Sequence, residues 1–174
     1  MTEFYPEGAK QAAEYVVGGE VVGTRHFYAS GAVEAEQILR SGRQHGPMVE
    51  WYENGQAAWA TTYVDGLEHG TARQWAADGT LVGEYRLEHG TGLDLWWTED
   101  GAGRWTLSES RYVKGGTRHG FEWLVNEDQV SVAGEGHYWE GQPHGILREW
   151  NAAGRLRRGF PQYWVQGVKV TKDE

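Results

Sequence analysis

Short segments in which apolar and polar residues alternate make up most of this chain of 174 residues. The segments are about seven residues long, and Asn-Gly, Asp-Gly or Gly-Gly dipeptides separate many of them. Segments of this length suit strands and are too short for helices, and these dipeptides supply the positive φ angles that two-residue hairpin turns need. The pattern therefore predicts roughly a dozen sequential antiparallel strands joined by hairpins.

The hairpin recurs along the chain, and a His-Gly dipeptide marks most of its copies. Five of the seven histidines stand in this dipeptide, at spacings of 24, 20, 30 and 25 residues. They are His45-Gly46, His69-Gly70, His89-Gly90, His119-Gly120 and His144-Gly145. An aromatic residue three positions before a turn glycine closes several units, as in Tyr63-Val64-Asp65-Gly66. Spacings of this size indicate a repeat architecture.

Alternation assigns the residues of each unit to two faces. In the segments 45–51, 69–75 and 144–150, the histidine and the closing tryptophan fall on one face, and the glycine falls on the other. We expect that glycine to provide space for an aromatic ring of the neighbouring strand. Histidines of successive units should lie two strands, about 9.6 Å, apart, which is too far for one metal ion. We therefore predict no metal site, and expect each histidine to cap a strand entry or to bond a turn carbonyl.

Composition changes the expected core. Leu, Ile, Val and Phe total only 31 residues and the net charge is −9, values typical of disorder, but the chain also holds ten Trp and nine Tyr. Aromatic rings bury large areas, so they replace the missing aliphatic core. The chain contains no cysteine, which excludes disulfides and thiolate chemistry. No long apolar run occurs and the N-terminus is acidic, so we predict no signal peptide, no membrane helix and a cytoplasmic location.

The unit resembles a known repeat family. Residues 45–55 followed by 63–70 look like the bacterial variant of the MORN (membrane occupation and recognition nexus) repeat, and the resemblance covers about residues 4–167. It implies an all-β, elongated single-layer antiparallel β-meander of about six MORN-type hairpins. Bacterial proteins of this type are commonly described as antitoxin-like, so the resemblance also implies an antitoxin or immunity role.

We predict one repeat array over residues 1–170, with a disordered tail at 171–174. The array is irregular at 98–137, because 98–111 contains an insertion and Asn126-Glu127-Asp128 stands where a turn glycine is expected. Loops on a rigid scaffold often carry binding sites, so this region is the predicted contact region, with ordinary repeat drift as the alternative. The candidate partner-binding residues are Trp96, Trp97, Trp105, Glu99, Asp100, Glu127 and Asp128. Because Trp96 and Trp97 are adjacent, they should face opposite sides of the sheet.

The sequence contains no catalytic or cofactor motif. Gly-x-Ser-x-Gly, Walker and dinucleotide-binding patterns are absent, and a single-layer sheet offers no deep cleft for paired carboxylates. We therefore predict a protein that is not an enzyme and needs no cofactor.

Charge favours a protein partner. Residues 1–87 carry a net charge of −6 and residues 88–174 a net charge of −3, which disfavours nucleic acid and anionic lipid. Aromatic residues dominate binding hot spots, and acidic surfaces complement basic proteins. The leading hypothesis is a monomeric, non-catalytic protein that binds a protein partner, such as a basic toxin or effector, through an aromatic, acidic sheet face. The alternatives are a membrane-surface scaffold that uses Arg155, Arg157 and Arg158, and carbohydrate binding through exposed tryptophans.

Overall fold

The computed structural model describes residues 2–172, which form 17 β-strands and no helix. In the first half these are β1 (Thr2–Phe4), β2 (Lys10–Val17), β3 (Glu20–Phe27), β4 (Val33–Arg40), β5 (Arg43–Trp51), β6 (Ala57–Val64), β7 (Leu67–Glu68), β8 (Gly70–Trp75) and β9 (Leu81–Glu88). In the second half they are β10 (Thr91–Glu99), β11 (Trp105–Lys114), β12 (Thr117–Val125), β13 (Val132–Trp139), β14 (Gln142–Pro143), β15 (Gly145–Glu149), β16 (Gln162–Val165) and β17 (Val168–Val170).

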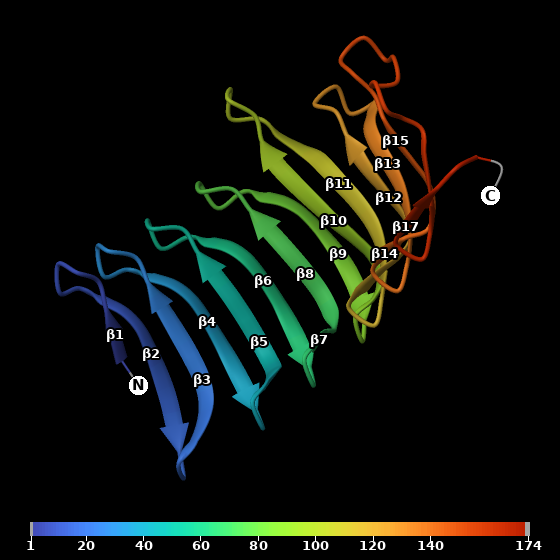
Figure 1. Cartoon of the computed structure of the whole chain (residues 1–174). Helices are drawn as coiled ribbons and strands as arrows, with labels where there is room; N and C mark the ends of the chain where they lie inside the picture. The colour runs from blue at the N-terminus through green and yellow to red at the C-terminus, as the bar shows by residue number, and fades with distance from the viewer. Residues whose placement is uncertain (1, 173–174) are drawn as a thin grey trace. The chain divides into compact units, whose positions relative to one another are not determined.

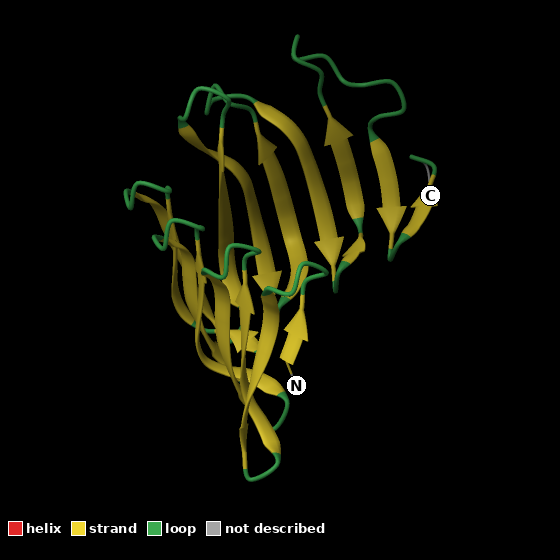
Figure 2. Cartoon of the chain, turned by 90° about the vertical axis from the view of Figure 1, so that its left-hand side faces the viewer, coloured by secondary structure: helices red, strands yellow, loops and turns green. Residues whose placement is uncertain are grey.

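The chain divides into two compact units, residues 1–89 and 90–174. Within each unit the strands follow one another as antiparallel hairpins, and no helix covers them (Figures 1 and 2). The predicted all-β antiparallel meander is therefore confirmed, whereas the single array over 1–170 stays a prediction. Of the predicted tail, Thr171 and Lys172 follow β17, and Asp173 and Glu174 lie outside the described residues.

The strand register confirms that equivalent residues of successive hairpin repeats lie opposite one another across the sheet. Val49 of β5 pairs with Ala60 of β6, and Ala60 pairs in turn with Arg73 of β8. Val49 and Arg73 occupy equivalent positions of two successive hairpin repeats, as their common alternation predicts. Arg148 occupies the same position in β15, where it pairs with Glu135 of β13.

Two kinds of turn alternate along the sheet, and the sequence pattern distinguished them incompletely. Turns such as Asp65-Gly66 are two-residue turns in which both residues have positive φ, 51° and 88°. At Asn54-Gly55, by contrast, the loop has three residues. Tyr52 N–H donates to Gln56 O and Gly55 N–H donates to Tyr52 O. Within this loop Gly55 takes the positive φ, 84°. The prediction of two-residue turns is thus correct for Asp65-Gly66 and wrong for Asn54-Gly55, which forms the three-residue type.

The His-Gly dipeptide marks β-bulges. Gly46, Gly70, Gly120 and Gly145 have φ of 103°, 97°, 78° and 103° inside or beside strands, a conformation that favours glycine. The predicted space for a neighbouring ring exists at Gly120, where an added Cβ would lie 3.8 Å from Tyr112 Cδ1, but at Gly70 no atom lies within 4 Å. The recurring reason for glycine is therefore the backbone angle. The fifth dipeptide, His89-Gly90, is itself a two-residue turn.

Side chains join several neighbouring hairpins at both ends of the strands. At one end, tyrosine hydroxyls donate to backbone carbonyls of the following hairpin, at 2.7–2.9 Å. The pairs are Tyr5 to Phe27, Tyr28 to Trp51, and Tyr52 to Trp75. At the other end, histidine Nδ1 accepts from a turn N–H, at 3.2–3.3 Å. These pairs are His45 with Asp65, His69 with His89, and His144 with Gln166. These three histidines thus cap turns by accepting from amides and not, as predicted, by bonding turn carbonyls, whereas His119 contacts the ring of Trp139.

The core is small, as a single layer of strands requires. The buried apolar residues are Ala72, Ala76, Tyr85, Leu87 and Val113. Several polar side chains are equally buried, among them Asp94 and Glu122 of the second unit. Stability therefore depends on contacts between neighbouring hairpins and on satisfied polar groups.

Candidate binding faces of the second unit

The sheet of the second unit has two chemically different faces. Across β10 to β13, Asp94 pairs with Arg111, Arg111 with Glu122, and Glu122 with Gly136, so these residues share one side of the sheet. We call this side the charged face. The residues between them in sequence, including Trp123 and its register partner Glu135, lie on the opposite side, which we call the aromatic face.

The aromatic face carries a group of partly exposed rings. Phe121, Trp123 and Trp139 are 37%, 43% and 46% exposed. Phe121 and Trp123 stack with ring centroids 4.7 Å apart, and Trp139 lies 4.5 Å from the ring of His119. We call these four residues the aromatic patch. Trp123 is opposite Glu135, which forms an ion pair with Arg148 at the border of the patch.

The charged face holds a buried ion-pair network. Arg111 Nε lies 2.7 Å from Asp94 Oδ2, and Arg111 Nη1 lies 2.9 Å from Glu109 Oε1. Arg118 Nε lies 3.1 Å from Glu122 Oε1. The side chains of Asp94 and Glu122 are only 8% and 10% exposed and that of Arg111 is 21% exposed, whereas Arg118, at the edge of the network, is 44% exposed. The Arg111–Asp94 pair is costly to break by removing the arginine, because the buried Asp94 carboxylate is then left uncompensated.

Burial and charge shift the pKa of several groups in the network. Burial raises the pKa of Glu122 most strongly; the charge of Arg118 lowers it by less than burial raises it, and the neighbouring Glu109 raises it by a smaller amount. Burial opposes the charge of Arg111, but the adjacent carboxylates, Asp94 first among them, raise the pKa of its guanidinium overall. Burial and the negative charge of Glu122 raise the pKa of Tyr138. Glu122 is therefore the carboxyl of this network that burial makes costly to ionise.

We expect Glu122→Gln to stabilise the chain at about pH 7 and to change its stability little at about pH 4. A pKa raised in the folded state means that protonation of Glu122 favours folding. This contribution is complete below the unfolded pKa and is lost as the pH rises through the folded pKa, while glutamine resembles the protonated form throughout. Urea unfolding of both proteins across this pH range measures the difference. Glu127→Gln, at an exposed loop carboxyl, is the control. Equal effects of the two variants, or a destabilised Glu122→Gln protein at neutral pH, contradict the prediction.

The structure separates the two central residues of the predicted contact region. Trp96 lies on the charged face, 39% exposed, with the Arg111 guanidinium 5.7 Å from its ring centroid. Trp97 is half-buried and pairs with Leu107, beyond a bulge that shifts the register between Trp96 and Trp97. Trp105 is also half-buried and pairs with the exposed Glu99. The insertion in 98–111 extends the two strands, because the connecting loop closes as the other three-residue loops do.

Two of the predicted acidic contact residues hold their own loops together. Asp100 accepts hydrogen bonds from the N–H groups of Ala102 and Arg104, and these bonds lower its pKa. Asp128 accepts from Ser131 Oγ and from two backbone N–H groups, and its pKa is lowered by Ser131 above all. Glu127 is exposed in the same loop. These hydrogen bonds give Asp100 and Asp128 a structural role that the sequence analysis did not include.

Gln129 connects the two irregular hairpins. It takes the positive φ, 58°, that glycine takes in the other loops of this end of the sheet. Its side chain accepts from Leu107 N–H and donates to Leu107 O, both at 3.0 Å. The loop at 126–131 is therefore held against the part of β11 next to the register shift at Leu107.

The sequence analysis missed the aromatic patch. The signal was present, because Phe121-Glu122-Trp123 alternates and places both rings on one side. The predicted contact residues lie in the strands and loops on either side of these two rings. Trp139 joins the patch only through the pairing of β12 with β13, which places His119 beside it.

Other predicted sites are also placed by the structure. Among residues 2–172, no group of three or more acidic or histidine side chains is arranged to hold a metal ion. Arg155, Arg157 and Arg158 are exposed, and Arg157 lies 3.7 Å from Glu149 in an ion pair. The described residues form no helix that is both long and apolar enough to cross a membrane.

Neither a protein-family model nor a curated protein matches the chain.

Proposed function

We propose that this chain is a non-catalytic protein that binds a partner protein through the aromatic patch. The observation that supports this most directly is the exposure of three large rings on one sheet face, at 37–46% each. Contiguous exposed rings cost free energy in water, and rings of this kind form the centres of protein interfaces. The Glu135–Arg148 ion pair beside them suits the polar rim of such an interface.

The partner is proposed to be basic. The chain has a net charge of −9, and opposite charge speeds the encounter of two proteins. An antitoxin or immunity protein that neutralises a basic toxin or effector is the narrower form of this proposal, and it derives from the MORN-like pattern of the repeats. A membrane-surface scaffold is the competing form, for which the exposed arginines at 155–158 are the contact.

Affinity capture with two matched double variants tests the proposal. Phe121→Ala with Trp123→Ala removes two rings from the aromatic face, and Trp96→Ala with Leu124→Ala removes two comparably exposed side chains, 39% and 43%, from the charged face. We expect a stoichiometric partner from the native host, verified by reconstitution with the purified partner. The first double variant should weaken binding about tenfold or more, and the second should leave it nearly unchanged.

Three results would contradict the proposal. The absence of a stoichiometric partner would do so, as would equal loss in both double variants. The third result is that the protein sediments with anionic liposomes and that Arg155→Glu with Arg157→Glu abolishes this sedimentation. That result would favour the membrane-surface alternative instead. Circular dichroism of each variant shows whether the fold is retained.

A further inference from the structure

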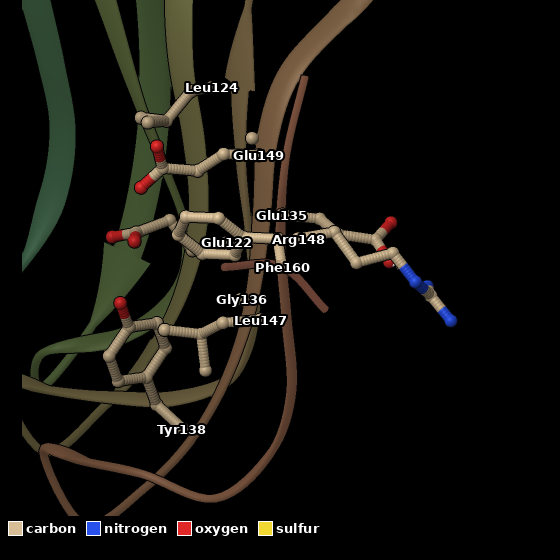
Figure 3. A pocket seen from close by; sticks show the side chains of 10 residues that line it. Glu122, Leu124, Glu135, Gly136, Tyr138, Leu147, Arg148, Glu149 and Phe160 are labelled. Atoms are coloured by element: carbon tan, nitrogen blue, oxygen red, sulfur yellow. Dashed lines mark hydrogen bonds and ion pairs between the residues drawn. The ribbon is translucent and has the colours of Figure 1, made fainter. Parts of the chain in front are cut away.

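A small pocket opens on the charged face of the second unit, on the side of the sheet opposite the aromatic patch. Its volume is about 70 Å³. Glu122, Tyr138, Glu149 and Phe160 line it together with Leu124 and Leu147. Figure 3 shows the carboxylates of Glu122 and Glu149 on the same side of the strands, above the ring of Tyr138, while Glu135 and Arg148 extend the other way.

Glycines in β13 make room for the pocket. The ring of Tyr138 folds back over Gly136, where an added Cβ would lie 2.8 Å from Tyr138 Cε2. At Gly134 an added Cβ would lie 3.3 Å from Leu124 Cδ1. The pocket floor is therefore bare backbone, and rings and aliphatic groups form the walls.

One carboxylate oxygen in the pocket lacks a hydrogen-bond donor. Glu122 is 8% exposed, and its Oε1 atom is buried without a hydrogen bond. Arg118 Nε lies 3.1 Å from this oxygen as an ion-pair partner, but outside hydrogen-bond geometry. The second carboxylate, Glu149, is only loosely paired, at 3.7 Å from Arg157. A buried carboxylate oxygen without a donor is costly, so a ligand that donates to it gains free energy.

Size and chemistry together define the ligand class. A cavity with about 70 Å³ open to the centres of water molecules holds several waters, which is enough for an ammonium or guanidinium group. Two carboxylates repel anions, and aromatic walls attract cations. The chain itself provides an example, because the Arg118 guanidinium already lies 5.4 Å from the ring centroid of Tyr138.

We infer that this pocket binds the cationic head group of a protonated amine or guanidinium ligand, such as a lysine or arginine side chain. The head group donates to Glu122 Oε1 and to Glu149, and the rings of Tyr138 and Phe160 enclose its apolar stem. This site is independent of the proposed partner contact, because it lies on the opposite face from Phe121 and Trp123.

Titration of the full ¹⁵N-labelled chain tests this inference. The probes are N-acetyl-arginine amide, N-acetyl-lysine amide and the neutral isostere N-acetyl-citrulline amide. We expect saturable shifts of the Gly134 and Gly136 amides with at least one cationic probe and not with citrulline. Methylguanidinium and methylammonium distinguish the two sources of the ligand. If the capped amino acid binds more tightly than the corresponding methyl compound, the ligand is a protein side chain, and if the two bind equally it is a free amine. Either result supports a head-group site.

Variants make the test specific to the pocket. Glu149→Gln should weaken binding about threefold or more, by removing one of the two carboxylates. Gly136→Ala should abolish it, because the new Cβ displaces the Tyr138 ring. Glu127→Gln removes an equal charge from a remote loop and should have no effect. Equal binding of citrulline, or equal weakening by Glu127→Gln and Glu149→Gln, overturns the inference. Partner capture by the aromatic patch should be retained in all three variants, so failure of one proposal is distinguishable from failure of the other.

Discussion

Gly90→Ala is expected to destabilise the chain by about 2–5 kcal/mol, since strain at positive φ and overpacking add together. Gly90 has φ of 67°, and an added Cβ would lie 2.5 Å from the backbone N of Gly116. That nitrogen donates to Gly90 O at 2.9 Å, so the two turns touch through their backbones. Backbone atoms on both sides of the contact cannot rotate away, and the turns must separate. Urea unfolding followed by tryptophan fluorescence measures the loss.

Gly154→Ala separates the cost of the close contact at Gly90 from the cost of the positive φ angle. Gly154 has φ of 69°, and no atom lies within 4 Å of its added Cβ. This variant should lose only about 1–2 kcal/mol, the cost of placing alanine in the left-handed region. If the two variants are equally destabilised, the close approach of the turns at Gly90 and Gly116 does not exist in solution.

Arg111→Met is expected to cost about 3–5 kcal/mol, because it breaks a buried ion pair on one side only. Arg111 contacts Asp94 at 2.7 Å and Glu109 at 2.9 Å, and their side chains are 8% and 22% exposed. Without the guanidinium, these carboxylates and Glu122 remain close together with Arg118 as their nearest cation. Chemical unfolding of the variant measures the loss.

Two further variants test whether the burial of the unpaired charges causes this loss of stability. Asp94→Asn in the Arg111→Met background should recover part of the stability, because it removes the most buried of the unpaired charges. Arg73→Met breaks an ion pair of similar length, 3.0 Å to Glu84, but the two side chains are 48% and 54% exposed, so the loss should stay below about 1 kcal/mol. If Arg73→Met costs as much as Arg111→Met, burial is not what makes the network important.

The hairpin architecture was predictable because its signals are local. Alternation over about seven residues defines a strand, and each copy of the unit repeats the same alternation, which is why the phase of Val49 and Arg73 was predicted correctly. Turn type was less predictable. Both Asn54-Gly55 and Asp65-Gly66 read as turns, but the number of residues in each loop depends on where the flanking strands pair.

The binding faces were only partly predictable, because exposure depends on neighbouring strands. Adjacent residues on a strand face opposite sides, as predicted for Trp96 and Trp97. That rule does not reveal which tryptophan is exposed. Trp96 stays 39% exposed beside the Arg111 guanidinium of the next strand, whereas Trp97 is half-buried.

By itself, the sequence determined the strands, the repeat and the two-sidedness of the sheet, since these follow from alternation and glycine within a few residues. Only the tertiary structure decided which side carries the aromatic patch and which buries Asp94, Arg111 and Glu122. The physical reason is that burial is set by residues from three or four strands, and bulges at positions such as Gly120 shift the register between those strands.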